Sequence, residues 1–444
     1  MCMKRIVIIG GGASGLACAI AAAESSRRAG NRAQIVVFEH DDRVGRSILA
    51  TGNGRCNFSN ARIDAALYRN ADFVGRVLSS LEREIPVRSD DESGLDVVHR
   101  FFRALGLEWR EEGEGRQYPL ANKASSVLDV LRAAAARLGV QEACERTVSA
   151  VEAPREDGGR FTLRMSDGVF ERADAVVVAC GGKASARLRV ADWPAPALRP
   201  VLGPLATDTS LIRELNNIRV RVSVRLLRAG DGDISAVRQI AVERGEVMFR
   251  KYGVSGIAVF NLSRFAEVGD ELSIDFLSEV LRGAALSDEV AADIALVPSV
   301  EAAQTRCLGR LDRLCSGLRA DAPTLDDFLR GLVLPQVAHV LLKSLGLQGS
   351  APATRDNALS LARALSDFRL RVQGIGDEVN CQVQRGGHDV SRVNPETMCA
   401  NDAPGLFVAG EALDVDAPCG GFNLHWAWAS GLLAGINAVR SLKA

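Results

Sequence analysis

The chain has 444 residues, of which 47% are hydrophobic and 25% are charged, and its net charge is −1. This length exceeds what one ordinary core supports, so two or three domains are expected in a globular protein of average composition. The near-zero net charge argues against a general binder of nucleic acids or membrane surfaces.

Cysteine usage and hydropathy narrow the class further. The ten cysteines are scattered singly, with no CxxC pair, so we expect neither a metal site nor a disulfide scaffold. No run of about 18 uncharged apolar residues is present. No signal peptide is expected before the first predicted strand, which begins at Arg5. We therefore expect a cytoplasmic protein without membrane association.

The N-terminal stretch predicts a strand, a glycine-rich turn, a helix and a second strand. The strands are expected at Arg5–Ile9 and Gln34–Phe38, with the helix from about Gly15 to Arg28. Such continuous apolar runs suit a parallel sheet that is covered on both faces. The turn Gly10–Gly15 has the GxGxxG pattern in the correct context, and Glu39 closes the second strand. The pattern predicts a dinucleotide site with phosphates at the helix N-terminus.

Each glycine of the turn has a separate expected role. Gly10 permits the tight turn, Gly12 lets the backbone approach a pyrophosphate, and Gly15 allows close packing of helix on strand. A carboxylate at Glu39 can accept hydrogen bonds from an adenosine ribose. This motif alone does not distinguish FAD from NAD.

The next segment favours FAD. Gly45 and Arg46 follow the acidic residue, and a second glycine-rich loop at 50–57 offers Thr51, Asn53, Arg55 and Asn57. A Gly-Arg pair at this distance is common in FAD enzymes, in which the longer cofactor extends past the first loop. The alternative is a surface loop in which Arg55 makes an ordinary ion pair.

The middle of the chain predicts first a mixed region and then an insertion. An amphipathic helix is expected at 124–138, a β-hairpin turns at Asp167-Gly168, and a buried strand covers Ala175–Ala179. Prolines near Trp193–Pro196 indicate a domain crossing. Beyond it, we expect β structure at 219–276, helices at 278–347, and a return to the β layer at 367–375.

The C-terminal segment predicts another strand, Leu406–Ala409, which ends at Gly410-Glu411. Asp414 follows, and Gly420-Gly421 open a helix that continues to Val439. Such a helix N-terminus can stabilise negative charge on a reduced flavin ring. A further βα unit with a C-cap glycine is the alternative, but glycines at the start of the helix argue against it.

Several stretches resemble one family. They are IVIIGGGASGLACAIAAA (6–23), TGNGRCNFSN (51–60), GRQYPLANKAS (115–125), ACGGKAS (179–185), GEVMFRKYGVSGIAVFNLSR (245–264), NPETM (394–398) and GLFVAGEALDVDAPCGGFNLHWAWASGLLAG (405–435). In this order, across nearly the whole chain, the sequence is similar to the BaiN-like (aminoacetone-oxidase-like) family of FAD-dependent oxidoreductases. The loop with GRCN and the final segment are the specific parts.

The resemblance implies an α/β protein with a discontinuous Rossmann-type FAD-binding domain, an inserted β-rich domain and a nested helical subdomain. The FAD domain would comprise 1–195 and 378–444, the β-rich domain 196–280 and 350–377, and the helical subdomain 281–349. Carried over by motif, the cofactor-binding residues would be Gly10, Gly12, Ala13, Ser14, Gly15, Glu39, Gly45 and Arg46 toward the adenosine, and Asn53, Gly54, Arg55, Cys56, Gly410, Asp414, Gly421, Asn423 and Leu424 near the flavin.

The chain departs from the family in a few places. About twenty residues of a Gly/Thr-rich stretch are absent after Ala184, which could open the flavin cleft or alter the hinge between domains. His425 stands where Gln is commoner, His388 where an aliphatic residue is commoner, and Ile257 where Pro is usual.

The catalytic group is not identified by the sequence, which offers His425, Cys419 and Arg55 as the main candidates. His425 could donate a proton, or could bind the flavin or belong to the core. Cys419, like Cys56, could be a thiol beside the flavin or a small packing residue. Arg55 could bind an anionic substrate or the flavin itself.

The leading functional hypothesis is an oxidoreductase in which FAD transfers hydride through its N5 atom to or from a small organic substrate. The family resemblance implies reduction of an activated C=C bond or oxidation of a small amine, and of these we favour the reduction, with NADH or NADPH as a transient electron donor. The alternatives are a non-catalytic flavin scaffold or redox sensor, and flavin-dependent RNA modification. No nucleic-acid partner is expected, and the oligomeric state does not follow from the sequence.

Overall fold

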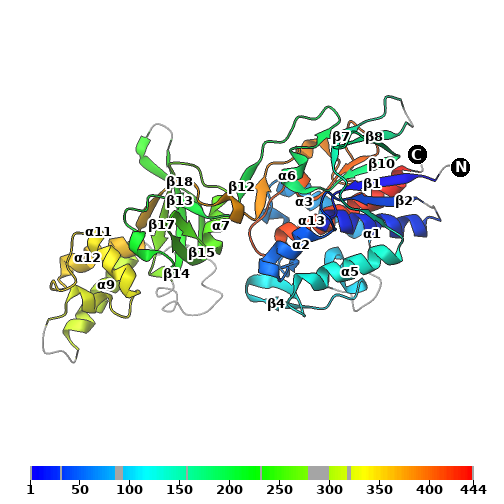
Figure 1. Ribbon diagram of the computed structural model, residues 1–444. Coiled ribbons are helices and arrows are strands. Elements are labelled where there is room, and N and C mark those ends of the chain that lie inside the picture. The colour runs from blue at the N-terminus through cyan, green and yellow to red at the C-terminus, as the bar shows by residue number, and fades with distance from the viewer. Residues whose placement is uncertain are drawn as a thin grey trace. The chain divides into compact units, whose positions relative to one another are not determined.

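The computed structural model describes residues 3–30, 33–85, 94–156, 159–230, 233–278, 300–317 and 322–442, without the side chains of 230 and 233–236. The chain forms two compact units (Figure 1). Unit 1 is made from both ends of the chain, residues 1–199 and 383–444, and unit 2 comprises residues 200–382. The predicted division into three domains at the boundaries given above stays a prediction.

A five-stranded parallel sheet is the centre of unit 1. Its strand order is β20-β10-β1-β2-β6, and Ile6 of β1 lies between Ala175 of β10 and Ile35 of β2. The predicted strands are confirmed, and their inner residues are buried on both faces. The bounds are β1 Arg5–Ile9, β2 Gln34–Phe38, β6 Gln141–Ala143, β10 Ala175–Val178 and β20 Leu406–Val408.

Helices from the two ends of the chain pack together in unit 1. Helix α1 (Ala13–Arg28) begins at the glycine-rich turn, and α13 (Phe422–Ser441) packs along it. A Cβ built on Gly431 would lie 2.3 Å from the Ser14 carbonyl oxygen, and one on Gly435 would lie 2.3 Å from that of Cys18. Glycine is therefore required where the two helix backbones meet, and this contact joins the N- and C-terminal segments into one domain.

We expect Gly435→Ala to destabilise unit 1 by about 1–3 kcal/mol, because the new methyl group meets fixed backbone rather than a movable side chain. Urea unfolding measures the change. Gly75→Ala in α3 (Ala71–Glu84) is the matched control, since its Cβ would make only an ordinary 3.5 Å contact with the Ala65 Cβ. The control should be neutral or up to about 1 kcal/mol stabilising, and equal losses in both variants would contradict the close-packing account.

The remaining elements of unit 1 surround this core. A four-stranded sheet has the order β11-β7-β8-β9, with the predicted hairpin joining β8 to β9, and a three-stranded sheet has the order β3-β5-β4. The three-stranded sheet, α3 and α4 were not predicted from the sequence. The bounds are β3 Ser59–Asn60, β4 Trp109–Glu112, β5 Arg116–Pro119, β7 Val148–Glu152, β8 Phe161–Met165, β9 Phe170–Ala173, β11 Arg189–Val190, α2 Arg46–Ala50, α4 Val97–Ala104, α5 Ala124–Arg137 and α6 Gly181–Ser185.

Unit 2 contains a closed barrel and a group of helices. The barrel has the strand order β13-β16-β15-β14-β17-β18, and the helices pack with it around a second hydrophobic core. The β structure expected at 219–276 is confirmed outside 257–263, and the expected return of the chain to the β layer at 367–375 is confirmed by β18. The bounds are β12 Arg199–Val201, β13 Leu205–Thr207, β14 Arg219–Gly230, β15 Asp233–Arg250, β16 Gly253–Ser255, β17 Glu271–Asp275, β18 Phe368–Ile375, α7 Ile257–Ser263, α9 Val300–Cys315, α10 Leu325–Leu329, α11 Pro335–Ser344 and α12 Arg355–Ser366. Strand β19, Val383–Arg385, begins the C-terminal segment of unit 1.

Two helices of unit 2 differ from the sequence expectation. The segment Ile257–Ser263 was expected to be β structure, but it forms α7, whose Ala258, Val259 and Leu262 are buried in the core. Tertiary packing overrides the weak β preference of so short an apolar run. Helix α12 lies where a β-rich segment was expected. The helical expectation at 278–347 also covers residues 279–299 and 318–321, which lie outside the described residues.

Among the helices that the structure describes, none combines the length and the apolar composition that crossing a membrane requires.

A buried carboxyl group in unit 2 gives a prediction of pH dependence. Asp275 at the end of β17 is 1% exposed, and burial raises its pKa to about 6, although Arg225 and Arg244 oppose this shift. Its Oδ1 accepts the Leu277 N–H at 2.8 Å, while its Oδ2 has no partner among the described residues. Because the pKa is raised on folding, the stabilising contribution is complete at low pH and is lost as the pH rises through about 6.

We therefore expect Asp275→Asn to be more stable than the unsubstituted chain at pH 8, by roughly 2–3 kcal/mol, and to lose this advantage near pH 4. Urea unfolding at several pH values tests this. The control is Asp270→Asn, because Asp270 is 4% exposed and binds Arg228 through two 2.8 Å contacts. That variant should be destabilised at pH 8, and a destabilised Asp275→Asn at pH 8 would contradict the account.

Candidate functional site

The glycine-rich turn between β1 and α1 has the geometry of a phosphate-binding loop. Gly10 has φ +105°, and a Cβ there would lie 2.6 Å from the Ala179 carbonyl oxygen. A Cβ on Gly15 would lie 1.9 Å from the Gly10 carbonyl oxygen. The protein's own packing therefore requires glycine at both positions, as the sequence predicted from the tight turn and the close helix contact.

Gly12 differs from these two glycines. Its backbone is extended (φ −82°, ψ −160°), and the only described atom within 4 Å of a Cβ there is the Ser47 hydroxyl at 3.2 Å. Neither backbone strain nor fixed packing explains this glycine. It is half-buried, and no described side chain caps the N–H groups of the following turn, which includes Ala13 and Ser14. The arrangement leaves space and unpaired donors where an anionic group fits.

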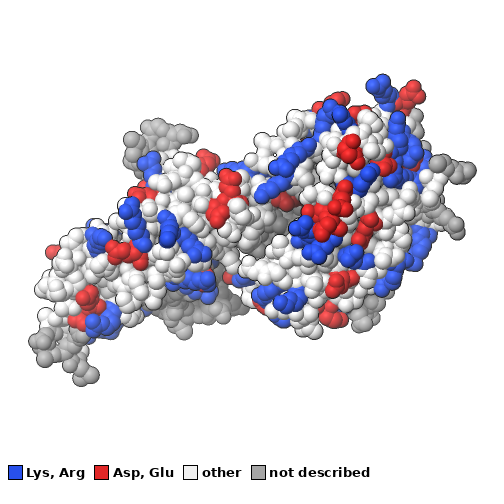
Figure 2. Space-filling model, viewed as in Figure 1, with Lys and Arg blue, Asp and Glu red and all other residues white. Residues whose placement is uncertain are grey.

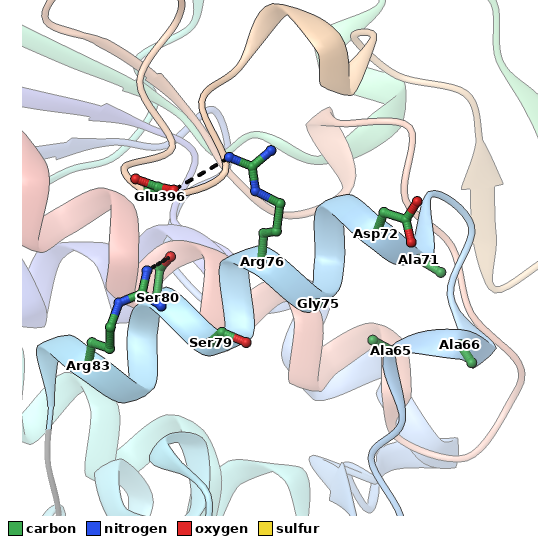
Figure 3. A pocket seen from close by; sticks show the side chains of 10 residues that line it. All are labelled: Ala65, Ala66, Ala71, Asp72, Gly75, Arg76, Ser79, Ser80, Arg83 and Glu396. Atoms are coloured by element: carbon green, nitrogen blue, oxygen red, sulfur yellow. Dashed lines mark hydrogen bonds and ion pairs between the residues drawn. The ribbon is translucent and has the colours of Figure 1, made fainter.

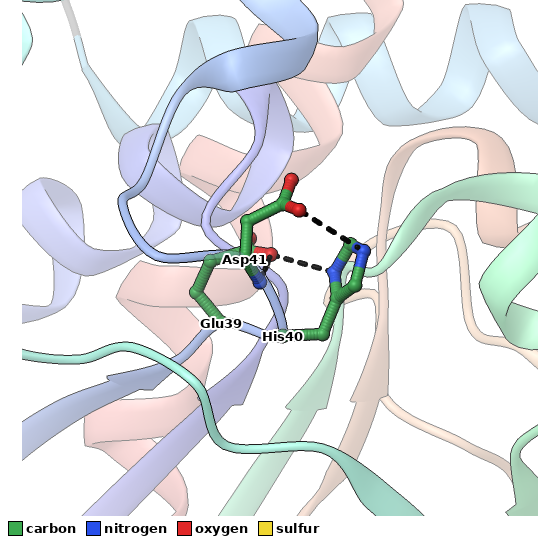
Figure 4. A group of neighbouring side chains, drawn as sticks. All are labelled: Glu39, His40 and Asp41. Carbon is green, nitrogen blue, oxygen red and sulfur yellow. Dashed lines mark hydrogen bonds and ion pairs between the residues drawn. The ribbon is translucent and has the colours of Figure 1, made fainter.

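Glu39 lies directly beside the turn at the end of β2. It is 7% exposed; its Oε2 accepts the Gly11 N–H at 2.7 Å and its Oε1 accepts the Asp41 N–H at 2.9 Å. The His40 ring lies against both Glu39 and Asp41, with Nδ1 2.7 Å from Glu39 Oε1 (Figure 4). A carboxylate has about four acceptor sites, so Glu39 retains capacity for ribose hydroxyls.

The predicted Gly-Arg pair is also at this turn. Gly45 has φ +79° and donates its N–H to the Gly11 carbonyl at 2.8 Å, which fixes the start of α2 against the glycine-rich turn. Arg46 is half-exposed and pairs with Asp41 at 2.9 Å. The residues predicted to surround the adenosine half of the cofactor are therefore brought together in unit 1.

The loop at 51–56 has an unusual backbone. Gly52, Asn53, Gly54 and Cys56 all have φ between +55° and +79°. Left-handed conformations are costly for residues other than Gly and Asn, and they concentrate at ligand sites. Cys56 is fully buried, and burial raises the pKa of its thiol to about 11. This favours a packing role for Cys56 over a reactive thiolate.

Arg55 is engaged within its own neighbourhood. Its guanidinium lies over the Tyr118 ring at 4.0 Å, its Nε donates to Asn122 Oδ1 at 2.5 Å, and its Nη2 pairs with Glu112. The Arg55 contact in turn lowers the pKa of Glu112. This geometry favours an ordinary ion pair between Arg55 and Glu112 over an Arg55 side chain that is free to bind an anion. The sequence had left both roles open.

The C-terminal segment closes onto the same region. Gly421 begins α13 with φ +97°, and a Cβ there would lie 2.2 Å from the Ser59 carbonyl oxygen, so the first turn of α13 rests on the segment after the 51–56 loop. Gly410 has φ +67°, and its Cβ would lie 2.6 Å from Ser14 Oγ at the start of α1. Three parts of the chain therefore meet around two helix N-termini.

The residues on either side of Gly421 differ in their contacts and burial. The Asn423 side chain accepts the Ala417 N–H and donates to the Ala417 carbonyl, both at 2.9 Å, so it fixes the turn before the helix. Leu424 and Cys419 are half-buried. Cys419 belongs to no disulfide among the described residues.

His425 is 1% exposed and its Nδ1 lies 2.9 Å from Ser59 Oγ. Burial lowers its pKa to about 4, although the nearby Asp96 raises it. The ring lies 6.1 Å from that of His99, whose pKa is raised by its hydrogen bond to Asp96 despite desolvation. Burial and the Ser59 contact favour a core role for His425 over proton donation, because a neutral buried ring at physiological pH is a poor proton donor.

Two groups near the site were not identified from the sequence as functional. Glu411, directly after Gly410, accepts the Gln384 N–H at 2.5 Å, and burial raises its pKa to about 7. A shifted carboxyl at the carboxyl end of a parallel strand is a typical sign of a functional position. The second group is a pair of arginines that hold the segment 414–416.

Asp416 and Asp414 each bind one of these arginines. Asp416 is fully buried and its two carboxylate oxygens each accept a hydrogen bond from Arg385 at 2.8 Å. Both carboxylate oxygens of Asp414 accept from the single Nε of Arg69, at 2.9 and 2.8 Å. The segment leading to Gly421 is thus held by two ion pairs that carry no local sequence signal.

Comparison with known proteins gives a consistent result. Residues 4–437 match the family described as HI0933-like protein Rossmann domain. The 3-dehydro-bile acid delta(4,6)-reductase of Clostridium scindens is 34% identical, with 98% of each chain aligned. Ribosomal RNA dihydrouridine synthases are more distant. The Escherichia coli protein is 26% identical over 96% of this chain and 95% of its own, and the Haemophilus influenzae protein 24% identical over 98% of each.

Proposed function

Because the chain belongs to the HI0933-like Rossmann-domain family, we propose that it binds FAD in unit 1 and reduces an activated C=C bond of a small organic substrate. The match confirms the resemblance to BaiN-like oxidoreductases that the motifs indicated. The chain is an oxidoreductase; its substrate class and its electron donor are the proposed parts.

The observation that carries FAD binding is the space at Gly12. The chain requires Gly10 and Gly15 for its own packing, but nothing described in unit 1 requires glycine at position 12. A ligand whose phosphates approach this backbone explains the residue. The left-handed loop at 51–56 and the start of α13 favour FAD over NAD, since they extend the binding surface beyond the first turn.

In this proposal, the residues of unit 1 bind and orient the cofactor. Glu39 accepts hydrogen bonds from the ribose, the first turn of α1 binds the pyrophosphate, and the first turn of α13 with Asp414 lies near the flavin. Bound FAD would supply the hydride chemistry. Gly421 lets the start of α13 lie close to the backbone at Ser59. The positive end of the helix dipole at this turn favours negative charge on a ligand bound there.

The substrate proposal rests on similarity. A relative with 34% identity over 98% of both chains is named a reductase of 3-dehydro-bile acids. A double bond conjugated to a carbonyl group accepts hydride at its β-carbon, and a proton taken up from water at the α-carbon completes the reduction. NADH or NADPH is proposed as the transient donor.

Flavin-dependent RNA modification is the second candidate, because two relatives are named ribosomal RNA dihydrouridine synthases. On the face shown in Figure 2, basic and acidic side chains are interleaved over both units. The expectation that no nucleic acid binds stays a prediction.

Anaerobic mixing distinguishes these functions. The purified protein, loaded with FAD, is mixed with NADH or NADPH and then with either a conjugated enone or ribosomal RNA. We expect bleaching by a nicotinamide donor, followed by reoxidation with the enone. Reoxidation by RNA alone would favour RNA modification, and a flavin that neither donor reduces would favour the scaffold or sensor.

A further inference from the structure

Three consecutive residues that precede α3 hold Asp414 and the start of α13, two of them through contacts with Asp414. Arg69 Nε donates to both Asp414 oxygens at 2.9 and 2.8 Å, and the Asn70 side chain donates to the Asp414 carbonyl at 2.7 Å. The Tyr68 hydroxyl donates to the Phe422 carbonyl at 2.8 Å, in the first turn of α13. These contacts fix the carboxylate and the start of α13 to the same short segment.

The two partners of this ion pair differ in burial. The Asp414 side chain is 19% exposed and the Arg69 side chain 45% exposed. Asp414 also accepts the Gly386 N–H at 3.0 Å, which fixes its orientation without neutralising its charge. Removing Arg69 would leave a largely buried negative charge, which is costly and interacts strongly with other charges nearby.

We propose that Arg69 is a positioning residue that neutralises Asp414 and thereby sets the preference of the site for reduced over oxidised FAD. This rests on the proposed function, in which Asp414 lies near the flavin. Reduced flavin carries more negative charge than oxidised flavin, so an unneutralised carboxylate nearby disfavours it. Arg69 cancels this repulsion and helps the α13 N-terminus to stabilise the reduced form.

The test measures the binding of FAD in both oxidation states. In Arg69→Gln, we expect reduced FAD to bind about tenfold more weakly relative to oxidised FAD, which lowers the midpoint potential by about 30 mV for a two-electron couple. Arg69→Lys keeps the charge and should restore most of the difference. In Asp414→Asn the carboxylate is removed while Arg69 stays, so the potential should rise.

Arg76→Gln is the matched control. Arg76 lies two turns further along in α3, in a surface groove of about 550 Å³, and pairs at 3.4 Å with the exposed Glu396 (Figure 3). This substitution removes the same charge at a position seven residues further along the chain, away from Asp414, and should leave the potential unchanged.

A lowered midpoint potential in Arg69→Gln and a raised one in Asp414→Asn support the proposal. General structural damage would shift the potential in the same direction in both variants. If Arg69→Gln fails to fold, a nearly unchanged potential in Arg69→Lys together with a raised potential in Asp414→Asn supports the proposal, and a potential that Asp414→Asn leaves unchanged overturns it. Unchanged potentials, or shifts of the same sign, would overturn the role of Arg69 while leaving FAD binding intact. An unsubstituted chain that takes up no FAD would instead overturn the proposed function.

Discussion

Gly12→Asp is expected to weaken FAD binding by at least about 100-fold, which corresponds to about 2.7 kcal/mol, while the protein stays folded. The backbone at Gly12 is extended, and only the movable Ser47 hydroxyl lies near a new Cβ among the described atoms. The fold therefore accepts a side chain at this position. A carboxylate there would occupy the space of the pyrophosphate and repel its charge.

The measurement is titration of the stripped protein with FAD, with urea unfolding of the protein without cofactor in parallel. Gly12→Ala should lower affinity less, since it adds bulk without charge. Gly15→Ala is the contrasting variant, because its Cβ would lie 1.9 Å from the Gly10 carbonyl oxygen and should destabilise the fold itself. Full affinity in a folded Gly12→Asp protein would refute the position of the phosphates.

Asp416→Ala is expected to lower the free energy of unfolding by about 3–5 kcal/mol, because it deletes the buried member of an ion pair. Asp416 is fully buried and Arg385 is 15% exposed, with two contacts of 2.8 Å between them. The Arg385 guanidinium would lose both charge-assisted hydrogen bonds. Because the same segment leads to Gly421, FAD affinity should fall as well.

Urea unfolding at pH 7 checks this value. The control is Glu396→Ala, whose ion pair with Arg76 has both side chains more than half exposed. Loss of that surface pair should change stability by less than about 1 kcal/mol. A similar small change in Asp416→Ala would show that the Arg385 pair does not hold the segment.

The local parts of the site could be predicted from the sequence. Gly10, Gly15 and Glu39 follow from short-range patterns, since a strand, a tight turn and a helix of standard length leave few alternatives for those positions. The buried runs at β1, β2, β10 and β20 also predict their own sheet, because parallel strands covered on both faces need continuous apolar sequence.

The contacts between distant segments could not be predicted in this way. Arg69 and Asp414 are 345 residues apart, and neither residue type indicates its partner. The requirement for glycine at Gly431 and Gly435 depends on how two helices approach, which composition does not specify. The ion pair of Arg55 with Glu112 likewise arises only when β4 lies beside the 51–56 loop. The roles of the side chains around Asp414 and the start of α13 are therefore the least predictable part of the candidate site.

The central claim is that the two ends of the chain form one FAD site, and the visible spectrum of the purified protein tests it most directly. We expect a flavin spectrum, and FAD rather than FMN in the supernatant after the protein is denatured. A protein that is colourless as purified and does not bind added FAD would contradict the claim.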